Sequence, residues 1–192
     1  KRGDFDFAMN GLEVTPDRAR QLRFTRPYYV YRLRLVVRRD ETRFDTLLGC
    51  REAGGVVATL EDTAAERLLD QLGIRKRIYD SQAEPYSDLE QGQVDAVLLD
   101  LPIADYYARN RPRLRYAEEP EVRGYYAVAF RPDQEALARQ FDAAIAELWS
   151  TGRLREIYEK WGLWNEDQAL LGTLGPGGDV LGDSARKWTL AQ

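Results

Sequence analysis

Residues 89–100 read LEQGQVDAVLLD, and this stretch decides the fold class. The helix that ends at Gly92 is followed by the mostly apolar run Val94–Leu99, which predicts a buried strand. Asp100 stands directly after this strand, just before Pro102. Parallel α/β sheets bind ligands at the carboxyl ends of their strands, and Asp100 fits that rule.

The same alternation of strands and helices extends along most of the chain. Strands are predicted at residues 4–9, 32–38, 55–60, 77–79, 114–116 and 125–130. Helices are predicted to start at Thr15 and to cover residues 63–72, 87–91, 103–109, 134–149 and 154–161. Strands that alternate with helices at these spacings predict an α/β fold with a parallel sheet covered on both faces.

Composition excludes several classes of function. The chain has 192 residues, 44% hydrophobic and 31% charged, so it is globular, and it contains no apolar run of the roughly 18 residues that a membrane span requires. Histidine is absent, which excludes Ser-His-Asp catalysis and histidine metal sites. Cys50 is the only cysteine, so an intrachain disulfide and a thiolate zinc site are excluded. The net charge of −4 argues against nucleic acid as a partner.

Three polar residues lie where an α/β sheet binds ligands. Arg18 falls in the first turn of a helix, Thr63 opens the helix after a strand, and Asp100 ends the buried strand. An arginine fork and a hydroxyl suit a carboxylate, and an aspartate suits an ammonium group, so together they would recognise both ends of an α-amino acid. Each has a simpler interpretation: Arg18 as a solvated helix residue, Thr63 or Asp62 as a helix cap, and Asp100 as the cap of the next helix.

Four segments of the sequence resemble a known family when they are taken in order. They read MNGLEVTPDR (residues 9–18, with FTRPY at 24–28), VATLEDT (57–63), LEQGQVDAVLLD (89–100), and LWSTGRL with IYEKWG (148–154 and 157–162). Over residues 1 to about 165 the chain resembles the amino-acid-binding periplasmic solute-binding proteins of ABC transporters, that is, bacterial extracellular solute-binding protein family 3.

The resemblance implies two doubly wound lobes joined by two hinge strands. Lobe 1 would comprise residues 1–38 and 122–165, and lobe 2 residues 39–121. Lobe 1 would lack the family's opening segment and be incomplete at its N-terminus. Residues 166–192 are rich in glycine and are expected to form a flexible linker, which resembles the join to a membrane permease in fused transporters.

The resemblance also implies roles for individual residues. Arg18 and Thr63 would hold the carboxylate of the ligand, and Asp100 its α-ammonium group. Asn10, Gly11 and Glu13 would add contacts from lobe 1, and Asp62 would lie beside Thr63 at a position where the family has glycine. Glu13 replaces a small residue, and this second carboxylate favours a cationic side chain on the ligand or pairs with Arg18.

The implied function is binding of an amino acid, polar or cationic, on the outer side of the cytoplasmic membrane or in the periplasm. The ligand would be delivered to an ABC-transporter permease, without catalysis, metal or other cofactor. The alternatives are an enzyme on the same fold, similar to cyclohexadienyl dehydratases or to the binding-like domain of lytic transglycosylases, and the sensor domain of a receptor. Glu13, Asp62 and Asp100 are candidate acids or bases, but no paired-carboxylate spacing singles them out.

Overall fold

The computed structural model describes residues 5–117 and 122–175. It divides the chain into two compact units: unit 1 is Lys1–Tyr31 with Arg123–Gln192, and unit 2 is Arg32–Val122. The sequence placed the two boundaries after residues 38 and 121. The chain thus passes from unit 1 to unit 2 after Tyr31 and returns at Arg123.

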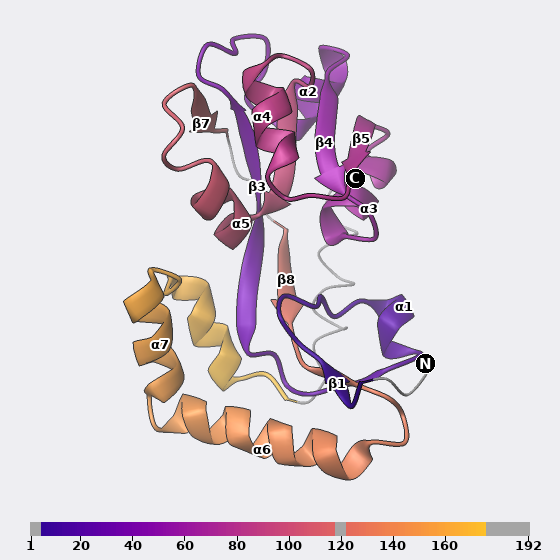
Figure 1. Ribbon diagram of the computed structural model, residues 1–192, viewed down its shortest axis with the longest axis vertical. Coiled ribbons are helices and arrows are strands. Elements are labelled where there is room, and N and C mark those ends of the chain that lie inside the picture. The colour runs from indigo at the N-terminus through magenta and orange to yellow at the C-terminus, as the bar shows by residue number, and fades with distance from the viewer. Residues whose placement is uncertain (1–4, 118–121, 176–192) are drawn as a thin grey trace. The chain divides into compact units, whose positions relative to one another are not determined.

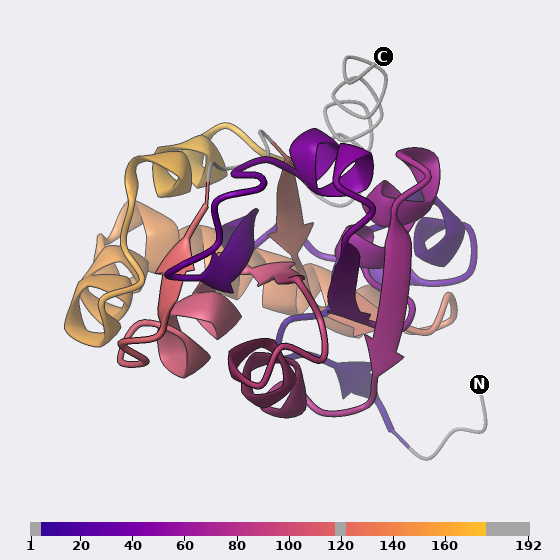
Figure 2. The ribbon, with the colours of Figure 1, turned by 90° about the horizontal axis from the view of Figure 1, so that it is seen from above.

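Unit 2 holds most of a six-stranded sheet, with helices between successive strands. Its elements are β3 (Tyr29–Arg38, which begins in unit 1), α2 (Leu47–Glu52), β4 (Val56–Leu60), α3 (Ala64–Gln71), β5 (Arg75–Tyr79), α4 (Glu84–Glu90), β6 (Ala96–Asp100), α5 (Leu101–Tyr107) and β7 (Leu114–Tyr116). The strand order is β5-β4-β6-β3-β7, with β8 paired to β3 outside this path. Strands β4 and β5 lie side by side in Figure 1 and Figure 2.

The sheet is mixed, so the prediction of a parallel sheet is wrong for one strand. β4 is parallel to β5 and β6, whereas β3 is antiparallel to both of its neighbours, β6 and β7. The helices α3, α4 and α5 return the chain to start each following strand in the same direction. β3 comes before these three helices in the chain, so none of them determines its direction. It lies between β6 and β7 and runs antiparallel to both.

The core of unit 2 forms where α4 and α5 cover one face of this sheet. Tyr86 and Leu89 of α4 and Ala104 of α5 are fully buried against Val97 and Leu99 of β6. Every residue of β6 is buried, as the apolar run in the sequence predicts. The buried β6 holds Asp100 at a fixed place on the carboxyl edge of the sheet.

In the described residues, unit 1 is built on a small antiparallel sheet and four helical segments. Its elements are β1 (Phe7–Ala8), α1 (Pro16–Ala19), β2 (Arg23–Phe24), β8 (Arg123–Tyr126), β9 (Ala129–Phe130), α6 (Glu135–Ser150), α7 (Arg153–Trp161) and the 3-10 helix η1 (Glu166–Gly172). β9 lies between β1 and β2. Phe130 of β9 packs with Ala138 and Ile145 of α6, so the predicted apolar face of this helix meets the sheet.

Residues 166–172 differ from the flexible linker expected from the sequence. They form η1, in which Gln168 is fully buried and Asp167 and Leu171 are also buried. The glycines that suggested a linker begin at Gly172, and the stretch before them, EDQALL, has apolar residues that can pack. The remainder of the expected linker, residues 176–192, lies outside the described residues.

Candidate functional site

Two of the predicted site segments meet at one edge of the sheet in unit 2. Ala58 of β4 pairs with Val97 of β6, and both strands run in the same direction. Asp100, three residues beyond Val97, is therefore level with Glu61 and adjacent to the turn that contains Asp62 and Thr63. The carboxyl edge of the sheet thus brings Asp62, Thr63 and Asp100 together, as the sequence predicts.

The Thr63 side chain caps helix α3. Its hydroxyl accepts a hydrogen bond from the Glu66 N–H (3.1 Å) and donates its own proton to the Leu60 carbonyl (2.8 Å). A hydroxyl has a single proton, and a ligand carboxylate can only accept. Contact between this hydroxyl and a carboxylate would therefore require the bond to Leu60 to break, and the capping interpretation is the one that the structure shows.

Thr63→Ala is expected to destabilise unit 2 by about 1 kcal/mol, because the cap and its bond to the Leu60 carbonyl are lost together. Chemical denaturation followed by circular dichroism would measure the change. Thr63→Ser keeps the hydroxyl and should retain most of the stability. Equal stability of Thr63→Ala and the wild type would show that the cap contributes nothing.

Asp100 has the position of a helix cap without its hydrogen bond. It precedes α5 with an extended backbone, and its side chain makes no capping hydrogen bond. The residue is only 8% exposed. A buried carboxylate is stabilised by a positively charged or hydrogen-bonding partner. The structure does not show the hydrogen bond that the capping interpretation of Asp100 requires.

Asp62 lies at the same edge but has a more exposed side chain. Its backbone is left-handed (φ 56°), which explains why glycine would suit this position. Its N–H donates to the Glu66 carboxylate (2.7 Å), and its own carboxylate lies 3.5 Å from Arg67 with 73% of the side chain exposed. These contacts assign Asp62 mainly to the turn.

In unit 1, Arg18 and Glu13 form a half-buried pair. Thr15 caps α1, with Pro16 and Asp17 in its first turn, as predicted. Arg18 donates to the Glu13 carbonyl (3.2 Å), and its Nη1 lies 3.8 Å from the Glu13 carboxylate. The side chains are 21% and 6% exposed, respectively, so Arg18 is not a solvated helix residue. Pairing with Arg18 is thus what the structure shows for Glu13, and Glu13 alone no longer argues for a cationic ligand.

The loop before Glu13 has an unusual backbone. Asn10 and Gly11 are consecutive left-handed residues (φ 84° and 80°), a conformation that asparagine and glycine tolerate best. The Gly11 N–H donates to the Tyr28 hydroxyl (2.9 Å). Burial raises the pKa of Tyr28 above its ordinary value, although this bond acts in the opposite direction. The neutral hydroxyl therefore anchors the loop that carries Asn10, Gly11 and Glu13.

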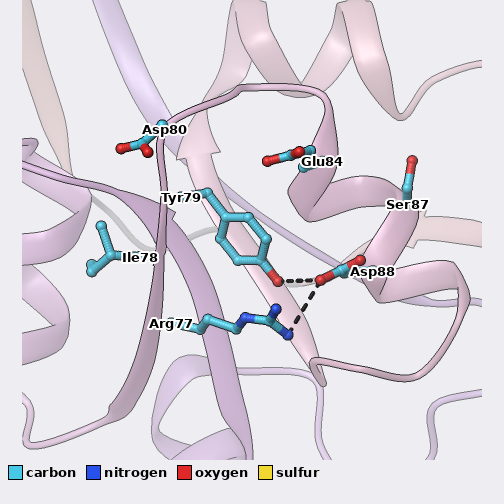
Figure 3. Close-up of a pocket in the computed structure, with 7 residues that line it drawn as sticks. All are labelled: Arg77, Ile78, Tyr79, Asp80, Glu84, Ser87 and Asp88. Atoms are coloured by element: carbon cyan, nitrogen blue, oxygen red, sulfur yellow. Dashed lines mark hydrogen bonds and ion pairs between the residues drawn. The ribbon is translucent and has the colours of Figure 1, made fainter.

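A hollow of about 390 Å³ in unit 2 lies between the end of β5 and helix α4 (Figure 3). Tyr79 donates to Asp88 (2.7 Å), and Arg77 lies 3.2 Å from the same carboxylate. Burial, together with the bond to Asp88, raises the pKa of Tyr79 to about 12. None of the predicted site residues lines this hollow.

Asp80 and Glu84 also line the hollow, and sequence reasoning did not select them. Asp80 follows a predicted strand directly, as Asp100 does, so the rule that selected Asp100 could have found it. Among the described residues no group of acidic residues or cysteine could hold a metal ion, and no helix is both long and apolar enough to cross a membrane.

The sequence has relatives among curated amino-acid-binding proteins. It is 27% identical to the ABC transporter arginine-binding protein 1 of Escherichia coli over 82% of this chain and 66% of the relative. It is also 27% identical to the L-cystine-binding protein TcyJ of Escherichia coli, over 81% of this chain and 59% of that protein. The chain therefore spans less than two thirds of the length of these relatives.

Solved structures agree with this similarity. The amino acid ABC transporter substrate-binding protein AbpA of Streptococcus pneumoniae, bound to L-arginine, matches with a TM-score of 0.75 and 27% identity over 82% of this chain and 68% of that chain. The P235GK mutant of ArgBP from T. maritima matches with a TM-score of 0.76 and 25% identity over 83% of this chain and 69% of that chain. The fold is that of the periplasmic amino-acid-binding proteins, as the resemblance implied.

The family model itself covers most of the chain. Residues 1–163 match the model of the bacterial extracellular solute-binding proteins, family 3. This range includes all of unit 2, the part of unit 1 up to residue 163, and every predicted site residue, from Asn10 to Asp100. The chain belongs to the bacterial extracellular solute-binding proteins, family 3.

Proposed function

We propose that the chain binds an L-amino acid and passes it to an ABC-transporter permease, without catalysing a reaction. The observation that carries the proposal is the position of Asp100, a buried carboxylate at the carboxyl edge of the sheet. It suits an α-ammonium group, and the half-buried Arg18 suits the α-carboxylate. The curated relatives support this function, because they are named as binding proteins.

We further propose that the ligand is cationic, with L-arginine as the first candidate. The residues predicted to bind the ligand include the carboxylates of Glu13 and Asp100 and a single guanidinium, that of Arg18, and an acidic set of residues favours a ligand with a net positive charge such as arginine or lysine. A curated relative and a solved structure are named for arginine binding.

The proposed location is the periplasm or the outer side of the cytoplasmic membrane. The family is described as extracellular, and one relative is named as the arginine-binding periplasmic protein of Mannheimia haemolytica. The name of another relative, an ABC transporter arginine-binding protein, supports delivery to a permease. Whether the permease is a separate chain or fused to this one does not change the binding chemistry.

Titration of the purified chain with L-arginine in a calorimeter tests the proposal, and L-leucine serves as the apolar comparison. Asp100→Asn is expected to weaken L-arginine binding about tenfold or more, because the amide removes the charge that meets the ammonium group. The melting temperature of Asp100→Asn is measured as well, so that a loss of binding can be distinguished from a loss of stability.

Asp40→Asn, at an exposed position of unit 2, is the matched control and should bind as the wild type does. Equal affinity of Asp100→Asn and Asp40→Asn would remove Asp100 from the site. Tighter binding of leucine than of arginine would contradict the cationic preference.

A further inference from the structure

The segment that follows α7 makes contacts that the family match does not cover. The match ends at residue 163, whereas the structure continues through η1 to Gly172 and beyond. In Figure 1 this segment is the yellow chain beyond α7. We refer to residues 163–172 as the C-terminal clasp.

The Gln168 side chain of the clasp forms hydrogen bonds with both backbone groups of Val30, as a neighbouring strand would do. Its Oε1 accepts the Val30 N–H (3.1 Å), and its Nε2 donates to the Val30 carbonyl (2.7 Å) and to Asn165 Oδ1 (2.9 Å). Both Gln168 and Val30 are fully buried. Without this side chain, two buried backbone groups of β3 would lose their partner, which is costly away from water.

The neighbouring residue, Asp167, holds the other strand through which the chain crosses between the units. Its carboxylate lies 2.7 Å from Arg123 Nε, and the Asp167 side chain is 8% exposed. Arg123 is the first residue of unit 1 on the return of the chain, and Val30 is the residue before the last one on its way out. Two consecutive residues of the clasp therefore hold the unit 1 ends of both connections.

The clasp is itself fixed to unit 1. Tyr29 donates to the Leu163 carbonyl (3.1 Å), and Asn165 Oδ1 caps η1 by accepting the Asp167 N–H (3.1 Å). A Cβ atom at Gly172 would lie 2.8 Å from Trp149 Nε1, so the chain passes closely over this ring of α6. A segment anchored at both ends can transmit restraint to the strands that it contacts.

We propose that the C-terminal clasp is a conformational device that restrains both connections between the units and slows ligand release. Rupture of the clasp frees the start of β3 and of β8 while the core between β9 and α6 remains folded. The connections then open more often, and a bound ligand leaves faster. The part of the proposal that concerns ligand release rests on the proposed amino-acid binding.

Hydrogen exchange of the full chain without ligand tests the restraint directly. Gln168→Ala and Asp167→Asn are compared with Glu166→Gln, which changes an exposed residue of the same helix. In Gln168→Ala, peptides that contain Val30 should exchange about tenfold faster, and in Asp167→Asn those that contain Arg123–Tyr126 should do so. Peptides of α6 should exchange as in the wild type, and Glu166→Gln should change neither region.

Gln168→Glu keeps the shape of the side chain but loses both donated bonds, so it provides the test if Gln168→Ala does not fold. Unchanged exchange at both strands would overturn the proposal. A uniform rise that includes α6 would also overturn it, because the segment would then act only on global stability.

Stopped-flow measurement of L-arginine dissociation tests the functional consequence. Dissociation from Gln168→Ala should be several-fold faster than from Glu166→Gln, and equal rates would overturn the link to ligand release. If the wild-type chain does not bind L-arginine, the proposed function fails, whereas the exchange experiment still decides whether the clasp restrains the strands.

Discussion

Arg18→Ala is expected to lower the affinity for L-arginine by about 30-fold or more, which corresponds to about 2 kcal/mol. The Arg18 side chain is only 21% exposed, and its planar guanidinium can bind a carboxylate through two parallel hydrogen bonds. Such a bond, shielded from water, is worth more than the same contact on a wet surface. Calorimetric titration measures the loss.

Two nearby arginines provide matched controls for this experiment. Arg20 is 72% exposed beside Asp17, and Arg23 is 44% exposed beside Glu135. Arg20→Ala and Arg23→Ala remove the same charge from unit 1 and should bind L-arginine as the wild type does. Equal affinity of all three variants would sink the assignment of Arg18.

The pair with Glu13 complicates the interpretation of Arg18→Ala, because its removal leaves a buried carboxylate without this partner. Arg18→Lys addresses the problem, since it keeps the charge near Glu13 but loses the fork. If the fork is what binds the ligand, Arg18→Lys should be stable and should still bind weakly. Full affinity of Arg18→Lys would show that only charge matters at this position.

The sequence predicts the local elements of unit 2 well because each has its own local cause. Val94–Leu99 is mostly apolar, and the buried strand β6 forms over Ala96–Asp100, while Thr63 has a hydroxyl that can cap a helix start. The strand direction of β3 has no such local cause. The direction of β3 depends on the strands that lie beside it in the folded sheet, β6 and β7. No residue within Tyr29–Arg38 indicates that these strands will be its neighbours.

Contacts between side chains that are distant in the sequence also could not be predicted from the local sequence pattern. Gln168 reaches Val30 across 138 positions, and a lone glutamine in a polar stretch gives no sign of burial. Glu13 and Arg18 are close enough in sequence for both interpretations to be foreseen, but their spacing could not decide between a ligand contact and an internal pair. The distance between the two groups and their burial, which arise only in the folded chain, decide between these interpretations.

The second large effect concerns stability: Gly124→Ala is expected to destabilise unit 1 by about 3 kcal/mol. A Cβ atom at this position would lie 2.1 Å from both Cζ and the hydroxyl oxygen of Tyr31, well inside van der Waals contact. Gly124 is not in the left-handed region, so the cost comes from this overlap and not from backbone strain. Thermal and chemical denaturation would measure it.

The residues around Tyr31 prevent its ring from moving away from the new Cβ atom. The residue is 2% exposed, and its ring stacks on Tyr126 at 4.6 Å between centroids, while Tyr126 in turn stacks on Tyr29 at 5.9 Å. A shift of one ring therefore disturbs three, in a core that is densely packed. The Cβ atom must displace either this stack or the β8 backbone.

A double-mutant cycle with Tyr31→Leu separates steric overlap from a general effect of alanine in β8. Leucine lacks the Cε1, Cζ and hydroxyl atoms that the new Cβ would meet, so Gly124→Ala should cost little in the Tyr31→Leu background. The coupling energy between the two positions should then account for most of the loss of about 3 kcal/mol that Gly124→Ala causes in the wild-type background. Additive losses in the double variant would contradict this, because the damage would then arise without the Tyr31 ring.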